Sequence, residues 1–222
     1  MIHLHNISVL QRRRFVLHAL SLYLARGDSL ALVAPEPEQQ DSLIRILTGQ
    51  ITPSAGTATL QGRAVAHTCV ARALIGAFSV RENIQLLARL NAMDPVYYCA
   101  EIDDLCGFGP RLNDPLHCFS ARDRRRFVHA ATIALRADIL IQSDPGLSDT
   151  AHAAHTARCD AFLARRQQRF ADIRLYPTAA IPAHPHNRWA VFIGPDLIAC
   201  DTRAQITEII DLAKFKEPAL YA

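Results

Sequence analysis

The chain has 222 residues, of which half are hydrophobic and a fifth are charged, and its formal net charge is +3. This composition excludes a disordered chain, and so small a charge gives no reason to expect nucleic-acid binding. No apolar run approaches the roughly 20 residues that span a bilayer, and no signal-peptide pattern opens the chain, so we expect a soluble or peripheral protein. The six cysteines form no C-x-x-C pair, which predicts reduced thiols in a cytosolic protein.

Patterns in the first part of the chain predict strands around one helix. Alternating apolar residues predict two antiparallel strands over 2–9 and 15–24, joined by a polar turn. The next stretch, 29–49, predicts a buried strand, a loop and a helix, and a short strand is predicted over 57–60. A strand, a loop of this length and a helix form the frame that binds nucleotide phosphates in P-loop proteins.

The rest of the chain alternates helices with strands, which implies a mostly parallel sheet. A helix over 79–92 is predicted to begin with a capping box made by Ser79 and Glu82. Further helices are predicted over 95–106, 119–135, 149–170 and 203–214, and further strands over 138–143, 173–176, 189–193 and 197–200. The chain is therefore predicted to fold as an α/β protein.

The loop within 29–49 has the frame of a phosphate site without its chemistry. It contains no glycine and no lysine, and it carries the acids Glu36, Glu38 and Asp41. Acids at the start of a helix interact favourably with its dipole, which is one interpretation of these residues. A second interpretation, compatible with the first, is that the carboxylates occupy the vacated anion site and hold the loop shut.

Several segments resemble the nucleotide-binding subunit of ABC transporters, and in particular the capsular-polysaccharide and O-antigen exporters. HALSLYLARGDSLALV resembles the strands that lead into the phosphate loop, LIRILTGQITPSAGTATLQG resembles the helix, turn and strand after that loop, and SVRENIQLLARL resembles a segment typical of polysaccharide exporters. Phe119 of FSARD precedes Ser143 by 24 residues, as the signature motif precedes the Walker B aspartate in the family. The resemblance covers essentially the whole chain.

The fold that this resemblance implies is an ABC-type P-loop NTPase fold. It has an antiparallel β edge subdomain and a helical subdomain at about 79–136. The chain would form a single ATP-binding-cassette domain over 1–222.

The family's phosphate loop, G-x-x-x-x-G-K-[ST], is altered at every chemical position in this chain. Its two glycines, its lysine and its hydroxyl residue fall, in that order, on Ala34, Gln39, Gln40 and Asp41. Ser42 is retained beside them. Pro37 removes one backbone donor from the loop, and Gln40 cannot supply the positive charge of lysine.

The other family motifs are altered as well. The signature L-S-G-G-Q reads FSARD, which keeps Ser120 and places Arg122 at a glycine position. The Walker B pair becomes Ser143 and Asp144, and Asp144 is one methylene shorter than the family's catalytic glutamate. Phe15 aligns with the aromatic residue that stacks on adenine, so an adenine contact is still predicted there.

Two further family positions have lost their residue type. The switch histidine falls near Pro177 or Thr178, and the segment before SVRENI reads ALIGAF without the family's glutamine. No catalytic residue is predicted; Asp144 occupies the position of the family's catalytic glutamate. The predicted nucleotide-contacting residues share only their place in the family motifs; they are Phe15, Gln40, Asp41, Ser42, Ser120, Arg122 and Ser143.

Four histidines are candidate metal ligands. His152 and His155 lie three apart on a predicted helix, and His184 and His186 flank Pro185. Because no cysteine or carboxylate stands at the usual spacing from them, no metal site is predicted.

The resemblance implies ATP and Mg²⁺ as ligands and a membrane permease as partner. It also implies pairing with itself or with a homologous ATP-binding subunit, at the cytoplasmic face of the bacterial inner membrane. With the motifs altered, we predict a catalytically degenerate subunit of a polysaccharide export transporter, inactive or weak as an ATPase. The alternatives are a weak ATPase with unusual ligands that energises polysaccharide export, and a scaffold protein outside transport.

Overall fold

A computed structural model of the chain describes residues 1–143, 153–177, 186–200 and 202–216. The strands are β1 (Ile2–Gln11), β2 (Arg14–Leu24), β3 (Ser29–Val33), β4 (Ala55–Leu60), β5 (Ala64–Ala66), β6 (Ile139–Ser143), β7 (Ala171–Tyr176), β8 (Arg188–Ile193) and β9 (Asp196–Cys200). The α-helices are α1 (Pro37–Leu47), α2 (His67–Ala73), α3 (Val80–Leu90), α4 (Pro95–Cys106), α5 (Ala121–Ala134), α6 (Ala153–Ala164) and α7 (Arg203–Lys216).

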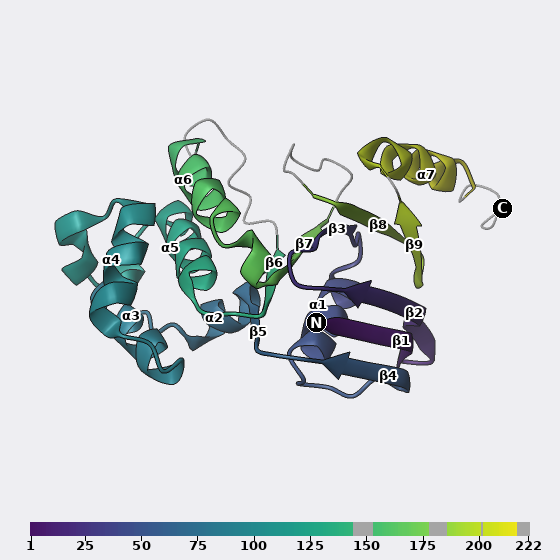
Figure 1. Ribbon diagram of the computed structural model, residues 1–222, viewed down its shortest axis with the longest axis horizontal. Coiled ribbons are helices and arrows are strands. Elements are labelled where there is room, and N and C mark those ends of the chain that lie inside the picture. The colour runs from purple at the N-terminus through teal and green to yellow at the C-terminus, as the bar shows by residue number, and fades with distance from the viewer. Residues whose placement is uncertain (144–152, 178–185, 201, 217–222) are drawn as a thin grey trace.

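The described strands form one mixed sheet, in the order β4-β1-β2-β9-β8-β3-β7-β6-β5. Figure 1 shows β1, β2 and β4 together at one end of the molecule, with α1 behind them, and α2 to α5 gathered at the other end. The parallel strands β3, β7 and β6 lie between these two ends. This arrangement separates an antiparallel edge from a helical part, with the parallel sheet between them.

The first two strands form the predicted antiparallel hairpin, and a β-bulge interrupts it. The registers of β1 with β2 and of β1 with β4 both shift around Asn6, whose φ is 51°. Gly56 on β4 passes the bulge so closely that a Cβ added there would lie 2.3 Å from the carbonyl oxygen of Asn6. The bulge explains why the apolar alternation of the sequence changes phase between Leu4 and Ile7.

The predicted buried strand and the predicted closing hairpin are both confirmed. All five residues of β3 are buried, and the strand pairs in parallel with β7 on one side and β8 on the other. Such continuous burial suits a strand that is covered on both faces. β8 and β9 pair antiparallel, and β9 joins the antiparallel edge through one pairing, His18 with Asp196.

Two predicted helices are confirmed almost residue for residue. The side chain of Ser79 accepts the N–H of Glu82, and the Glu82 side chain accepts the N–H of Ser79, so α3 begins with the predicted capping box. α4 has its predicted bounds: the carboxylate of Asp94 caps its start, and Gly107, at φ 67°, ends it. Proline in the first turn and glycine just past the end fix this helix from the sequence.

Three parts of the structure differ from the sequence prediction. The predicted loop that carries Glu36, Glu38 and Asp41 is shorter than expected, because α1 begins at Pro37 and contains Glu38 and Asp41. The strand β5 and the helix α2 were not predicted; α2 has seven residues, one buried side chain (Val70) and no side-chain cap, so it gives little periodic signal. For the helix predicted over 149–170, the part before 153 lies outside the described residues. The described part, α6, ends at Ala164, six residues earlier than predicted. A turn of 3-10 helix follows at Gln167–Arg169, and the guanidinium of Arg166 just before it donates to the carbonyl of Ile133 at the end of α5.

Two main clusters of buried apolar side chains fill the interior, and β6 divides them. Ile139 and Ile141 belong to the cluster beneath the sheet and α1, whereas Leu140 belongs to the cluster of the helical part. Alternate residues of a strand point to opposite faces, so one strand serves both cores. That the chain forms a single domain, with a helical subdomain at about 79–136, stays a prediction. In the part of the chain described here, no helix is long and apolar enough to cross a bilayer.

Candidate functional site

The connection between β3 and α1 is short and its amides are already bonded. β3 ends at Val33 and α1 begins at Pro37, which leaves three residues between them. The N–H groups of Gln39 and Gln40, at the second glycine and lysine positions, both donate to the carbonyl of Glu36, at 3.0 and 3.3 Å. A phosphate nest needs such amides to point at the anion, and here they close the first helical turn.

The two glutamines in the first turn of α1 bind within the protein. The side-chain amide of Gln40 donates to the carbonyl of Ala34 at 2.7 Å. Gln39 is buried, and its amide donates to the carbonyl of Gly194 between β8 and β9. Its Oε1 has no hydrogen-bond partner among the described residues. Ser42 accepts a hydrogen bond from Gln11 at 3.2 Å, so the retained serine is tied to the first strand.

Arginines hold the three acids, of which Glu36 precedes α1 and Glu38 and Asp41 lie in it. Arg14 of β2 binds Glu36 and Glu38 with the same nitrogen, at 2.9 and 3.0 Å. Asp41 lies 3.6 Å from Arg45 and 3.6 Å from Arg72. Glu36 makes no side-chain cap hydrogen bond to α1, so these acids act on the helix dipole by charge alone. Their partners are arginines rather than loop amides, which does not match the interpretation that they fill the vacated anion site.

Phe15, the predicted adenine contact, lies on the surface beside Arg14. The residue is 48% exposed, and its ring packs against His18 with the ring centroids 5.0 Å apart. His18 is in turn held by Asp196 at 2.8 Å. The exposed face of Phe15 is accessible to a flat ligand, and its role in binding adenine stays a prediction.

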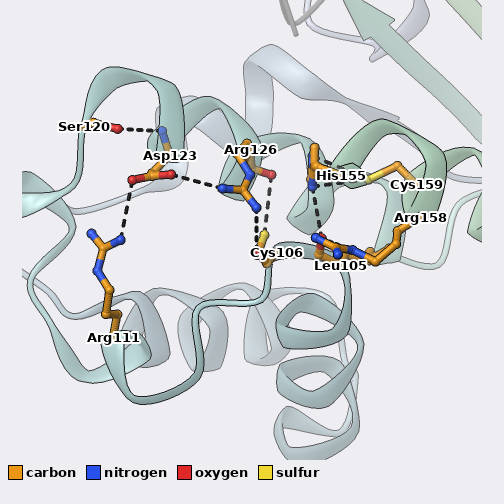
Figure 2. Close-up of polar contacts among 9 residues, drawn as sticks. All are labelled: Leu105, Cys106, Arg111, Ser120, Asp123, Arg126, His155, Arg158 and Cys159. Carbon is orange, nitrogen blue, oxygen red and sulfur yellow. Dashed lines mark hydrogen bonds and ion pairs between the residues drawn. The ribbon is translucent and has the colours of Figure 1, made fainter. Parts of the chain in front are cut away.

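The signature residues lie at the start of α5, in the helical part of the molecule (Figure 1). Ser120 caps this helix by accepting the N–H of Asp123 at 3.0 Å. Asp123, at the glutamine position, binds Arg126 at 3.3 Å and Arg111 at 3.6 Å (Figure 2). Arg122 is exposed in the first turn. The signature segment thus keeps the shape of a helix start, with its retained serine used as the cap.

Ser143 lies at the edge of the sheet where the parallel strands end. It pairs with Leu175 of β7, and the next residue of β7, Tyr176, pairs with Val33 at the end of β3. The structure therefore brings Ser143 to the same edge as the phosphate loop, one strand away. Asp144 and Thr178 lie outside the described residues. Pro177, which directly follows β7, is described and exposed.

The residues of this loop do not fit the triphosphate and Mg²⁺ that the family uses. The amides at the glycine and lysine positions are bonded, Pro37 has no N–H, and no lysine is present. Arginines near the loop are already paired with its acids: Arg14 with Glu36 and Glu38, and Arg45 and Arg72 with Asp41. A bound phosphate would therefore find neither the inward-pointing amides nor the lysine of the family's loop.

A second group of polar side chains, which the sequence analysis missed, lies between α5, α6 and β6. His129 Nδ1 lies 3.4 Å from His155 Nε2, and Cys159 Sγ lies 3.5 Å from the same atom. Burial lowers the pKa of His129 to about 3, and it raises the pKa of the Cys159 thiol to about 12. His155 and Cys159 stand four apart on one helix, and this spacing was the available signal.

The other candidate histidines are not in this group. His152 and His184 lie outside the described residues. His186 lies 2.7 Å from the hydroxyl of Ser29 and 3.3 Å from the hydroxyl of Tyr176, so it links β3 to β7.

The known proteins that this chain resembles in sequence are ATP-binding proteins of transport systems. No protein-family model matches the chain. The chain is 29% identical over 161 residues to the cytochrome c biogenesis ATP-binding export protein CcmA of Sphingopyxis alaskensis, which covers 72% of this chain and 81% of that protein. It is 24% identical over 128 residues to the O-antigen export system ATP-binding protein RfbB of Myxococcus xanthus, covering 56% of this chain but only 29% of that protein.

A solved structure confirms the predicted fold. The nucleotide-free ATP-binding cassette of an ABC transporter matches with a TM-score of 0.71 at 10% identity, over 95% of each chain. The sequence relatives include ATP-binding proteins of hemin and taurine import as well as of export. They are alike in being ATP-binding subunits, but they serve the transport of different substances.

Proposed function

We propose that this chain, an ATP-binding subunit of the ABC-transporter type by its relatives and its fold, is a catalytically degenerate member that serves a polysaccharide exporter without hydrolysing ATP. The observation that carries the proposal is the first turn of α1. There the amides at the second glycine and lysine positions are bonded to the carbonyl of Glu36, and no lysine is present. The subunit keeps the shape of the cassette and has lost its phosphate chemistry.

Polysaccharide export is supported by one relative and one segment. The O-antigen export protein of Myxococcus xanthus is among the relatives, and SVRENIQLLARL forms α3 with its capping box intact. Just before α3, the side chains of Ile75 and Phe78 are each 40% exposed. Exposed apolar side chains next to a well-ordered helix suit contact with a membrane permease, and we place the permease there.

The subunit would act as a peripheral protein at the cytoplasmic face of the bacterial inner membrane. In family dimers, each nucleotide lies between the phosphate loop of one subunit and the signature of the other. Two copies of this chain would alter both halves of both sites. A homologous subunit with an intact loop would still face Arg122 in place of a glycine, so its chemistry would be impaired.

The first test is a titration of the purified chain with fluorescent ATP and Mg²⁺. We expect no saturable binding in the low micromolar range. The double variant Glu36→Gln, Glu38→Gln serves as a matched control, because it removes two charges and leaves the amide bonds to the backbone carbonyl at position 36 in place. We expect it to bind ATP no better than weakly. Low micromolar affinity of the unaltered chain would refute the proposal.

The second test separates the proposal from its alternatives. Steady-state turnover of the chain, with Asp144→Ala as control, identifies a weak ATPase if turnover is robust and the substitution abolishes it. Affinity purification from membranes then distinguishes transport from scaffolding: a transporter subunit brings a permease with it, whereas a scaffold outside transport does not.

A further inference from the structure

Three side chains that bind soft metals meet in the interior between α5 and α6, away from the phosphate loop. His129 Nδ1, His155 Nε2 and Cys159 Sγ all lie within 4.8 Å of one another. His155 and Cys159 are 2% and 0% exposed. Figure 2 shows these two side chains side by side on α6, with His155 directed at the end of α4. The cluster therefore joins two helices and lies against a third.

The hydrogen bonds around the cluster fix the tautomer of His155. Its Nδ1 lies 3.0 Å from the carbonyl oxygen of Leu105, which can only accept a hydrogen bond. Nδ1 therefore carries the proton, and the lone pair of the ring is on Nε2. This lone pair is directed at His129, while Cys159 Sγ lies beside the ring, 3.5 Å from Nε2 and 3.8 Å from Nδ1.

The tautomer of His129 is fixed in the same way, through two further residues. Asp172 binds Arg174 and accepts the amide N–H of Gln142 at 2.7 Å, so the Gln142 amide presents its oxygen to His129. The distance from that oxygen to His129 Nε2 is 3.2 Å. Nε2 donates this hydrogen bond, and the lone pair of His129 is on Nδ1. Two imidazole lone pairs thus face each other across 3.4 Å.

This arrangement is that of a metal site with its outer shell in place. Histidines that bind metals usually donate their other N–H to a carbonyl, an amide or a carboxylate oxygen, as both histidines do here. In a tetrahedral zinc site, bonds of about 2.0–2.1 Å to nitrogen and about 2.3 Å to sulfur place two nitrogens about 3.4 Å apart and a nitrogen and a sulfur about 3.6 Å apart. Here the two nitrogens lie 3.4 Å apart and His155 Nε2 lies 3.5 Å from Cys159 Sγ, while the ligand atoms of all three residues lie within 4.8 Å of one another.

We propose that His129 Nδ1, His155 Nε2 and Cys159 Sγ bind one zinc ion in the interior of this protein. Imidazole and thiolate ligands favour zinc over the hard cations Mg²⁺ and Ca²⁺. On binding, the thiol of Cys159 gives up its proton and the sulfur–zinc bond forms, so the zinc ion and the thiolate together carry one positive charge. Asp172 is linked to His129 through Gln142, and its carboxylate is paired with Arg174.

The ion would have a structural role. It would join α5 to α6, and through the Leu105 carbonyl it would tie both helices to the end of α4, where Arg158 also donates at 3.1 Å (Figure 2). Because zinc binds the folded chain and not the unfolded one, it raises the melting temperature. An excess of zinc of about 100 times Kd is expected to raise the melting temperature by roughly 5–10 °C.

The test is a titration of the untagged, chelator-treated chain with Co²⁺, followed by displacement with Zn²⁺. We expect one equivalent of Co²⁺ to produce the absorption of a tetrahedral site together with a thiolate-to-cobalt charge-transfer band, and Zn²⁺ to remove both. A folded chain that shows no charge-transfer band with one equivalent of Co²⁺ would overturn the proposal.

Variants assign the band to its ligands. Cys159→Ala is expected to lose the band, whereas two controls keep it: Cys99→Ala, which removes another buried thiol, and Cys118→Ser, which removes an exposed one. Gln142→Ala removes the outer partner of His129 and is expected to weaken Co²⁺ binding by about 10–100-fold. A band retained by Cys159→Ala, or lost in either control, contradicts the assignment.

X-ray absorption of the zinc-loaded, unaltered chain makes the test independent of the folding of any variant. We expect a shell that contains one sulfur and at least two imidazole nitrogens. A shell without sulfur refutes the site.

Discussion

At the scale of single residues, the space around a glycine decides whether a larger residue can replace it. Gly56 and Gly49 both have positive φ, 85° and 70°, but their surroundings differ. Gly56 faces the carbonyl of Asn6 in the bulge of β1, whereas nothing lies within 4 Å of a Cβ added at Gly49. The two positions separate the cost of backbone strain from the cost of a clash.

Gly56→Ala is expected to destabilise the fold by at least about 2–3 kcal/mol, because the new Cβ would lie 2.3 Å from the Asn6 carbonyl oxygen. Gly49→Ala, the matched control, is expected to cost about 1–2 kcal/mol from its left-handed backbone alone. Urea unfolding of both variants measures the difference. Equal costs would show that β4 moves away from the bulge without penalty.

Asp138 is a second residue whose effect follows from its contacts. The backbone N–H of Arg63 and the guanidinium of Arg26 lower the pKa of the Asp138 carboxyl. A folded-state pKa below the unfolded value of about 3.9 adds stability above that pH, and the stability is lost as the pH falls through the folded value.

Asp138→Asn is therefore expected to be less stable than the unaltered chain at pH 7 and to approach it below about pH 4. Urea unfolding across this pH range provides the measurement. Parallel curves for the two proteins would show that the carboxylate has the same pKa in both states.

At the scale of elements, local signals predicted those helices whose ends are determined by their own residues. The capping box of α3 and the proline and glycine at the ends of α4 were visible in the sequence, and both helices are confirmed. The first turn of α1 was not predictable in this way. The helix starts at Pro37 because the carbonyl of Glu36 accepts hydrogen bonds from the amides of the first turn. The family pattern alone predicts a loop at these residues.

Ser79→Ala is expected to destabilise the fold by about 1 kcal/mol, because the N–H of Glu82 loses its acceptor at the start of α3. Glu36→Ala, at the start of α1, is the control: it has no side-chain cap hydrogen bond, and it is expected to change stability by less than about 0.5 kcal/mol. Thermal unfolding compares the two. A larger effect at Glu36 would mean that its ion pair with Arg14 stabilises the loop more than the cap stabilises α3.

At the scale of the whole molecule, the two cores meet at one strand. Ile139 and Ile141 pack beneath the sheet and Leu140 packs into the helical part, so β6 couples the two. The order of strands and helices predicted the fold class, whereas contacts between distant elements were beyond sequence patterns. The histidine cluster is an example, because His129 and His155 come from different helices and are 26 residues apart.

Leu140→Ala is expected to cost about 2–5 kcal/mol and to leave unfolding as one transition, if the chain is the single domain predicted. Circular dichroism follows all helices, and the fluorescence of Trp189, the one tryptophan of the chain, follows β8. Coincident transitions support a single domain. Separate transitions, with the helical part unfolding first, would show that the two cores are independent.

The short connection before α1 also bears on how many substitutions would turn this segment into a phosphate-binding loop. Replacing Gln40 by lysine would add a cation to a helix whose first amides remain bonded to Glu36, so this single step restores little. Pro37 would have to leave and glycines would have to enter before those amides could turn toward an anion. Under the proposed function, a loop that binds phosphate would therefore require several substitutions together, and no single one of them would be sufficient.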